Sequence, residues 1–203
     1  MPNAQLGREE QMLAFFVQHC EGRIGRTQLI KFLYLADYEA RRFLGRPISS
    51  VEYTWYHYGP YDQQFLNRIS SLRTARIIVE EPVAYPNGLQ GYVYVAGTEP
   101  ISFDFASDEL RVLNHVCETY SRVNLQSLLE DIVYETEPMR RAQALDARNQ
   151  PLDMSLVDNT RRFDFGVPYD ALIARSASAR TGTTLEHSVA MANLRSARRN
   201  ASA

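Results

Sequence analysis

Histidines and cysteines that could bind a metal ion occur at two places in the chain. His19 and Cys20 are adjacent, and His115 lies two residues before Cys117. Zinc sites use these side chains, usually as spaced pairs that converge from one face. Adjacent helical residues point about 100° apart, and the chain has no Cys-x-x-Cys pair. We therefore expect no metal site and no disulfide framework, and we expect both cysteines to be ordinary buried thiols.

Adjacent carboxylates occur at residues 9–10, 80–81, 108–109 and 130–131. A catalytic acid–base pair usually comes from separated positions that meet in a pocket. Each pair here falls instead at an expected helix end, turn or solvated face. The chain also has no nucleophile elbow, phosphate loop or dinucleotide fingerprint. A hydrolase is therefore the least favoured class of function, and we predict no catalytic residue and no cofactor.

Lys31, the only lysine of the chain, lies within a strongly apolar segment, and Asp37 follows six residues later. A buried lysine is costly unless it is paired. Its stem could pack while its amine reaches water, or the amine could pair with an acid such as Asp37. Asp37 could also pair with Arg41 one turn later, which on a surface contributes about 0.3–0.5 kcal/mol.

The densest aromatic run surrounds the only tryptophan. Alternate residues of an extended strand point to opposite faces, so one face should fill the core. This face carries either the odd-numbered residues from Tyr53 to His57 or the even-numbered ones from Thr54 to Tyr58. The other face could bind a partner, because such side chains offer much contact area and few rotatable bonds. The partner-binding residues that we expect are Trp55, Tyr56, Tyr58 and Tyr61.

Apolar periodicity predicts the elements that position these residues. Helices are expected at residues 7–21, 28–44, 60–74, 107–120, 125–132 and 139–148, a strand at 49–58, and a β-hairpin at 76–83 with 91–96. Thr27, Ser107 and Asn124 are the expected N-caps, and Gly45 is the expected C-cap. Pro60 suits the first turn of a helix. The predicted fold is a compact, mainly α domain with a small β-hairpin, of the α+β class.

Helices followed by a hairpin are also the order of elements in a winged helix. The helix at 60–74 would then be the recognition helix, and the hairpin would be the wing. Arg68 and Arg73 lie on that helix, but Asp62 lies in its first turn and Glu80–Glu81 lie on the wing. Carboxylates there would face phosphates, so DNA binding is disfavoured without being excluded.

The overall charge of −2 argues against a generic polyanion binder. The charge is uneven. The segment from residue 171 to the end has five arginines and one glutamate, for +4, whereas the rest has 17 basic and 23 acidic residues, for −6. No segment approaches the roughly 20 apolar residues of a membrane span, and we see no signal peptide. A cytoplasmic protein is expected.

Three motifs occur in order along the first half of the chain: residues 31–37 (KFLYLAD), 45–48 (GRPI) and 58–60 (YGP). Together they resemble the Panacea domain of SocA-like antitoxins, a family that also includes phage-associated proteins. The resemblance is plain from residue 28 to 72 and fades through Pro138. That family commonly has a histidine before an acidic–proline turn, and residues 133–138 keep the turn but lack the histidine. The motif residues to which we assign a structural role are Lys31, Asp37, Gly45, Pro47, Gly59 and Pro60.

This resemblance implies a non-catalytic protein that neutralises a cognate protein toxin, encoded by a neighbouring gene, by binding it directly. The alternative is a winged-helix DNA-binding transcriptional regulator. We expect the antitoxin domain at residues 1–148, an extended packing segment at 149–175 and a disordered basic tail at 176–203. Self-association into a homo-oligomer is possible.

Overall fold

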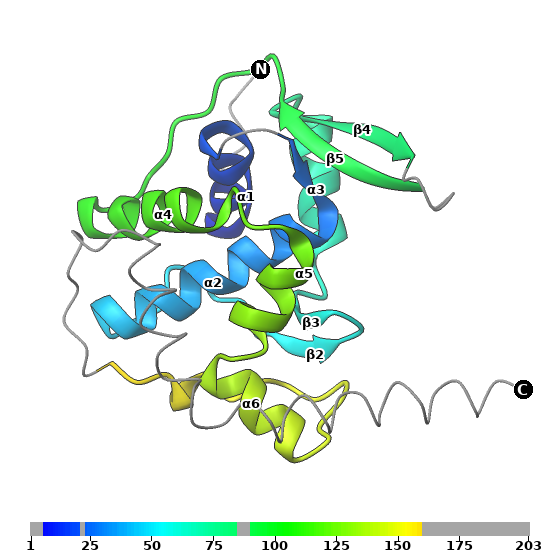
Figure 1. Cartoon of the computed structure of the whole chain (residues 1–203). Coiled ribbons are helices and arrows are strands. Elements are labelled where there is room, and N and C mark those ends of the chain that lie inside the picture. The colour runs from blue at the N-terminus through cyan, green and yellow to red at the C-terminus, as the bar shows by residue number, and fades with distance from the viewer. Residues whose placement is uncertain (1–5, 21–22, 85–89, 160–203) are drawn as a thin grey trace, which may run out of the picture. The chain divides into compact units, whose positions relative to one another are not determined.

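The computed structural model describes residues 6–20, 23–84 and 90–159. The described residues of the first half of the chain form three helices and two small antiparallel sheets (Figure 1). The helices are α1 (Arg8–His19), α2 (Arg26–Leu44) and α3 (Phe65–Thr74). A three-stranded sheet has the order β1–β5–β4 and comprises β1 (Ile24–Gly25), β4 (Ile78–Ala84) and β5 (Gln90–Ala96). A separate hairpin pairs β2 (Thr54–Tyr56) with β3 (Gly59–Tyr61).

The second half adds helices only, within the part of the chain that is described. These are α4 (Ser107–Tyr120), α5 (Leu125–Ser127), the π-helical turn η1 (Leu128–Val133), α6 (Glu137–Ala144) and the 3₁₀ turn η2 (Met154–Leu156). The predicted α+β class, with helices and small antiparallel sheets, is therefore confirmed. Residues 160–203, which include the predicted basic tail, lie outside the described residues.

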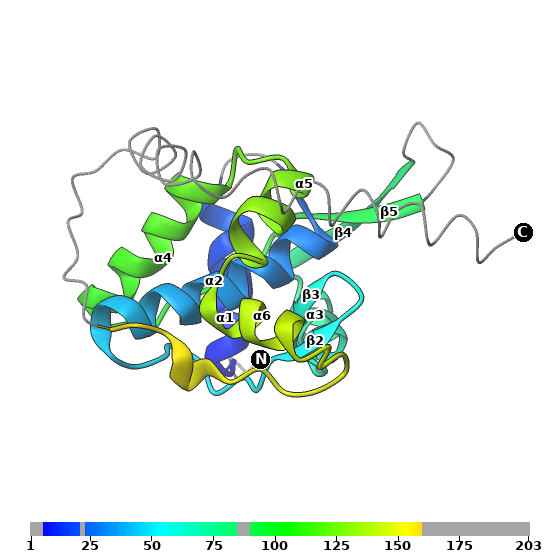
Figure 2. The same cartoon turned by 60° about the horizontal axis from the view of Figure 1, so that its bottom comes forward.

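Helix α2 lies at the centre of the described helices and packs against α1, α4 and η1 (Figure 1, Figure 2). Every residue from 31 to 40 is buried, so this helix faces neighbours on all sides. Phe32 packs edge-on against Phe16 of α1, with ring centroids 5.7 Å apart. On another side, the Tyr120 hydroxyl of α4 donates to Glu39 at 3.0 Å. The buried carboxylate of Glu39 therefore joins α2 to α4.

The ends of α2 agree only partly with the predicted caps. Gly45 is the C-cap in a left-handed conformation, with φ +69°, as predicted. The N-cap is Gly25 rather than Thr27, so that prediction was wrong. Ile24 and Gly25 pair with β5, and the chain enters the helix directly from the sheet. At the other predicted caps, Asn124 accepts from the amide of Ser127, whereas Ser107 is already the first residue of α4.

The predicted helix at 60–74 begins later than expected. Pro60 belongs to β3 and pairs with Trp55, and Gly59 has φ +91°, which favours glycine. Helix α3 starts only at Phe65, after Asp62 accepts a hydrogen bond from the amide of Gln64 at 2.9 Å. Proline suits a tight hairpin as well as a helix start, and only the pairing with β2 distinguishes the two.

The expectation that the cysteines are free thiols was wrong. Cys20 and Cys117 form a disulfide bond with Cα atoms 4.8 Å apart, although 97 residues separate them. Cys20 ends α1 and Cys117 lies in α4, and the two helices pack against each other. Sequence spacing carries no signal for this pairing, because it depends on the docking of α1 against α4.

The described helices are not candidates for membrane spans. None of those within residues 6–20, 23–84 and 90–159 has both the length and the apolar character needed to cross a bilayer.

Candidate functional site

The turn of the β2–β3 hairpin presents the aromatic run to solvent. Tyr56 is 45% exposed and Tyr58 is 65% exposed. The Tyr56 ring lies 4.2 Å from the ring of His57 and 5.5 Å from that of Tyr61, measured between centroids. These neighbouring rings make one aromatic surface, which we call the hairpin surface and define as Tyr56, His57, Tyr58 and Tyr61.

Neither of the two alternating faces that the sequence allowed is the buried one throughout. Residues 53–55 are all buried, and residues 56–58 are all exposed. The hairpin therefore changes along its length from a core segment to an exposed tip. Trp55, one of the four expected contact residues, lies on the buried side and is only 5% exposed. Tyr61 is half-buried.

Lys31 supports the hairpin from beneath. Its Nζ donates to the carbonyl oxygen of Pro60 at 2.5 Å, and the residue is only 1% exposed. A Cβ atom added to Gly59 would lie 3.7 Å from Nζ, so the hairpin backbone covers the amine closely. Among the described residues no carboxylate pairs with this amine. Burial lowers the pKa of Lys31 to about 7.

The Lys31 amine therefore neither reaches water nor pairs with Asp37, the two arrangements that the sequence suggested. It supports the hairpin by binding one backbone carbonyl with a single one of its donors.

Asp37 holds the chain that leads into the hairpin. Its carboxylate accepts from the amides of Ile48 and Ser49 at 2.9 and 2.8 Å, from the Ser49 hydroxyl, and from the Tyr53 hydroxyl at 2.7 Å. Burial raises the pKa of Asp37, while these hydrogen bonds act in the opposite direction. The expected pair with Arg41 does not form. Asp37 instead fixes the segment after Gly45, which contains Pro47, against α2.

Trp55 is enclosed by a segment that follows α6. The Arg148 guanidinium lies over the indole ring, 4.8 Å from its centroid. The amide of Asn149 donates to the Trp55 carbonyl at 2.8 Å, and the Trp55 amide donates to the carbonyl of Gln150 at 3.1 Å. The indole Nε1–H is buried and finds no acceptor among the described residues. Sequence periodicity missed this contact, because it joins residues more than 90 positions apart.

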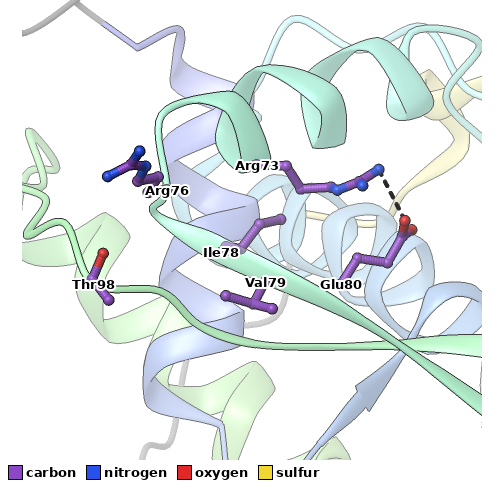
Figure 3. A pocket seen from close by; sticks show the side chains of 6 residues that line it. All are labelled: Arg73, Arg76, Ile78, Val79, Glu80 and Thr98. Atoms are coloured by element: carbon purple, nitrogen blue, oxygen red, sulfur yellow. Dashed lines mark ion pairs between the residues drawn. The ribbon is translucent and has the colours of Figure 1, made fainter.

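The surface between α3 and β4 carries arginines that are mostly neutralised. A hollow of about 460 Å³ is lined by Arg73, Arg76, Ile78, Val79, Glu80 and Thr98 (Figure 3). Arg73 turns toward Glu80 and pairs with it at 2.9 Å, while Arg76 points away. Glu80 also pairs with Arg26 at 2.9 Å.

Nearer the start of α3, the Arg68 guanidinium pairs with the carboxylates of Asp62 at 2.8 Å and Glu9 at 3.2 Å. The basic side chains of this helix therefore already have acidic partners, and they form no continuous basic stripe.

Comparison with known proteins adds one finding to this geometry. The family model described as "Antitoxin SocA-like, Panacea domain" matches residues 29–138, which is more than half of the chain. The search of curated proteins and the search of solved structures give no match. The matched region runs from α2 to the start of α6, and so includes Lys31, Asp37 and the whole β2–β3 hairpin, but it ends before Arg148. The chain therefore belongs to the SocA-like antitoxin family with a Panacea domain.

Proposed function

We propose that this protein is a non-catalytic antitoxin that neutralises a cognate protein toxin, encoded beside it, by binding the toxin directly in the cytoplasm. Membership of the antitoxin family supports the general role. The single structural observation that carries the mode of action is the hairpin surface, where two tyrosines are 45% and 65% exposed on a firmly supported turn. Exposed tyrosines on a rigid support are typical anchors of protein–protein interfaces.

In this mechanism Tyr56, Tyr58 and Tyr61 contact the toxin, and binding occludes the surface that the toxin needs. Trp55 belongs to the same site but supports the hairpin surface from its buried side, because its ring is enclosed when the protein is alone. Lys31 and Asp37 keep the turn in place through the carbonyl of Pro60 and the loop at residues 48–49. A preorganised turn binds more tightly, since less conformational entropy is lost on association.

Growth rescue tests this proposal. The protein is co-expressed with the product of the neighbouring reading frame, and colony formation is compared for the wild type, Tyr58→Ala and Tyr92→Ala. Tyr92 is a matched control, because it is 41% exposed but lies on β5 and stacks with Arg26. Rescue by the wild type and Tyr92→Ala, with loss of rescue in Tyr58→Ala, supports the proposal. A harmless neighbouring product, or equal rescue by all three proteins, would contradict it.

A winged-helix regulator is the second candidate, and only the order of helices followed by a hairpin in this chain favours it. The described arginines of α3 and its surroundings are largely paired with carboxylates, which opposes phosphate binding. DNA affinity that falls steeply across a salt series would favour this alternative.

A further inference from the structure

The segment that encloses Trp55 is paired with β2 like an additional strand. We call residues Arg148–Pro151 the strap. The Asn149 amide and the Gln150 carbonyl bond to Trp55, the amide of the following Leu152 donates to the Tyr53 carbonyl at 2.7 Å, and Thr54 and Pro151 form an antiparallel bridge. This pairing occupies the edge of β2 that faces away from β3. In both views the yellow trace after α6 passes beside β2 (Figure 1, Figure 2).

Backbone pairing with β2 and the contact of Arg148 with Trp55 hold the strap, and none of its own side chains is buried. All four of its residues are exposed, whereas Leu152 just after it is buried and anchors the chain. Asn149 has φ +61°, and Asp146 before the strap has φ +49°, a left-handed conformation that asparagine and aspartate adopt more readily than other side chains but less readily than glycine. Asn149 and Gln150 together oppose the single residue Trp55, as in a β-bulge, so the ladder is interrupted there.

The site beneath the strap has an unused binding group. The indole Nε1–H of Trp55 is buried without an acceptor among the described residues, although a buried donor normally has one. The strap covers the ring with the Arg148 guanidinium but supplies no acceptor to this group. A peptide that replaced the strap with an acceptor at this position would gain a hydrogen bond that the strap does not make.

From this geometry we infer that the β2 edge is a strand-addition site for an extended peptide segment, and that the strap occupies it in cis as a displaceable cover. The incoming segment pairs with the backbone of Tyr53 and Trp55 and places a carbonyl or carboxylate oxygen at Trp55 Nε1. Main-chain pairing supplies affinity, and the indole supplies specificity. We assign this segment to the toxin, and that assignment rests on the function proposed above. The site itself can be tested without any toxin.

A series of substitutions at Asn149 should change, in steps, how firmly the strap is bound to β2. Asn149→Gly keeps the amide and removes the strain, whereas Asn149→Ala keeps the amide but increases the strain. Asn149→Pro removes the amide donor and cannot adopt the positive φ. Because Trp55 is the only tryptophan, its fluorescence reports directly on the cover. Acrylamide quenching of the full-length protein should increase in the order Gly, Asn, Ala, Pro.

The binding probe is a labelled synthetic peptide with the sequence of residues 146–157, titrated by fluorescence anisotropy. It should bind Asn149→Pro at least tenfold more tightly than the wild type, and Asn149→Gly most weakly, because a firmly seated strap competes in cis. Circular dichroism checks that each variant is folded. If Asn149→Pro does not fold, Asn149→Ala takes its place in the comparison with the wild type.

Equal quenching and equal peptide affinity across the series would overturn the inference and make the strap a permanent part of the core. That result would leave the antitoxin function untouched. Peptide binding without growth rescue would instead retain the site and remove the toxin as its ligand.

Discussion

The buried amine of Lys31 predicts a pH dependence of stability that a single substitution should abolish. In the unfolded chain lysine has a pKa near 10.5, whereas burial lowers the pKa in the folded protein to about 7. Between these values the unfolded state binds more protons than the folded state, so the free energy of unfolding rises as the pH rises. One pKa unit corresponds to about 1.4 kcal/mol, and the shift therefore predicts a gain of about 2 kcal/mol between pH 7 and pH 9.

Urea unfolding at pH 7, 8 and 9 measures this gain in the wild type, Lys31→Met and Lys31→Arg. Lys31→Met should lose the gain and be more stable than the wild type at pH 7, because it places no charge in the core. Lys31→Arg should lose the gain and be less stable, because arginine stays charged. Other titrating groups are the same in all three proteins and cancel in the comparison. Parallel pH profiles for the wild type and Lys31→Met would refute the burial of an unpaired amine.

Three further predictions concern the framework of the domain. Asp37→Asn should lower the free energy of unfolding by about 3 kcal/mol in urea titrations at pH 7, because an amide cannot accept all the hydrogen bonds that reach this carboxylate; an unchanged midpoint would contradict its role in fixing the loop. Reduction of the Cys20–Cys117 disulfide should cost about 3–5 kcal/mol, given the 97-residue separation, and should shift the urea midpoint in dithiothreitol; Cys20→Ser should be insensitive to the reductant. Gly97→Ala should lower the melting temperature, because the added Cβ would lie 2.0 Å from the Arg76 carbonyl oxygen; an equal melting temperature would show that the backbone moves freely there.

Local signals in the sequence identified the features that depend on neighbouring residues. Gly45 follows the last apolar residue of a helix and adopts the left-handed cap. The buried nature of the central helix also follows from its own residues. Pro60 gives no such local signal, since proline fits both a helix start and a hairpin, and the choice depends on the pairing with Trp55.

The features that the sequence did not predict depend on contacts between distant residues. The disulfide needs α1 and α4 to be docked, and the strap needs residues 148–151 to meet β2. Lys31 gave a partial signal, because an isolated lysine in an apolar helix is costly. Its acceptor is a backbone carbonyl, which carries no side-chain signature at all. Neither of the two alternating faces predicted for the aromatic run matches the structure, in which residues 53–55 are buried and residues 56–58 are exposed.

Copurification measures directly whether the toxin binds through the hairpin surface. The tagged full-length protein and the product of the neighbouring reading frame are co-expressed, and the complex is quantified after affinity capture and gel filtration. We expect a stoichiometric complex with the wild type and with Tyr92→Ala. Tyr56→Ala and Tyr58→Ala should lose the complex or weaken it at least tenfold, while circular dichroism shows that all variants are folded. No complex with the wild type, or complexes of equal strength with every variant, would contradict binding through the hairpin surface.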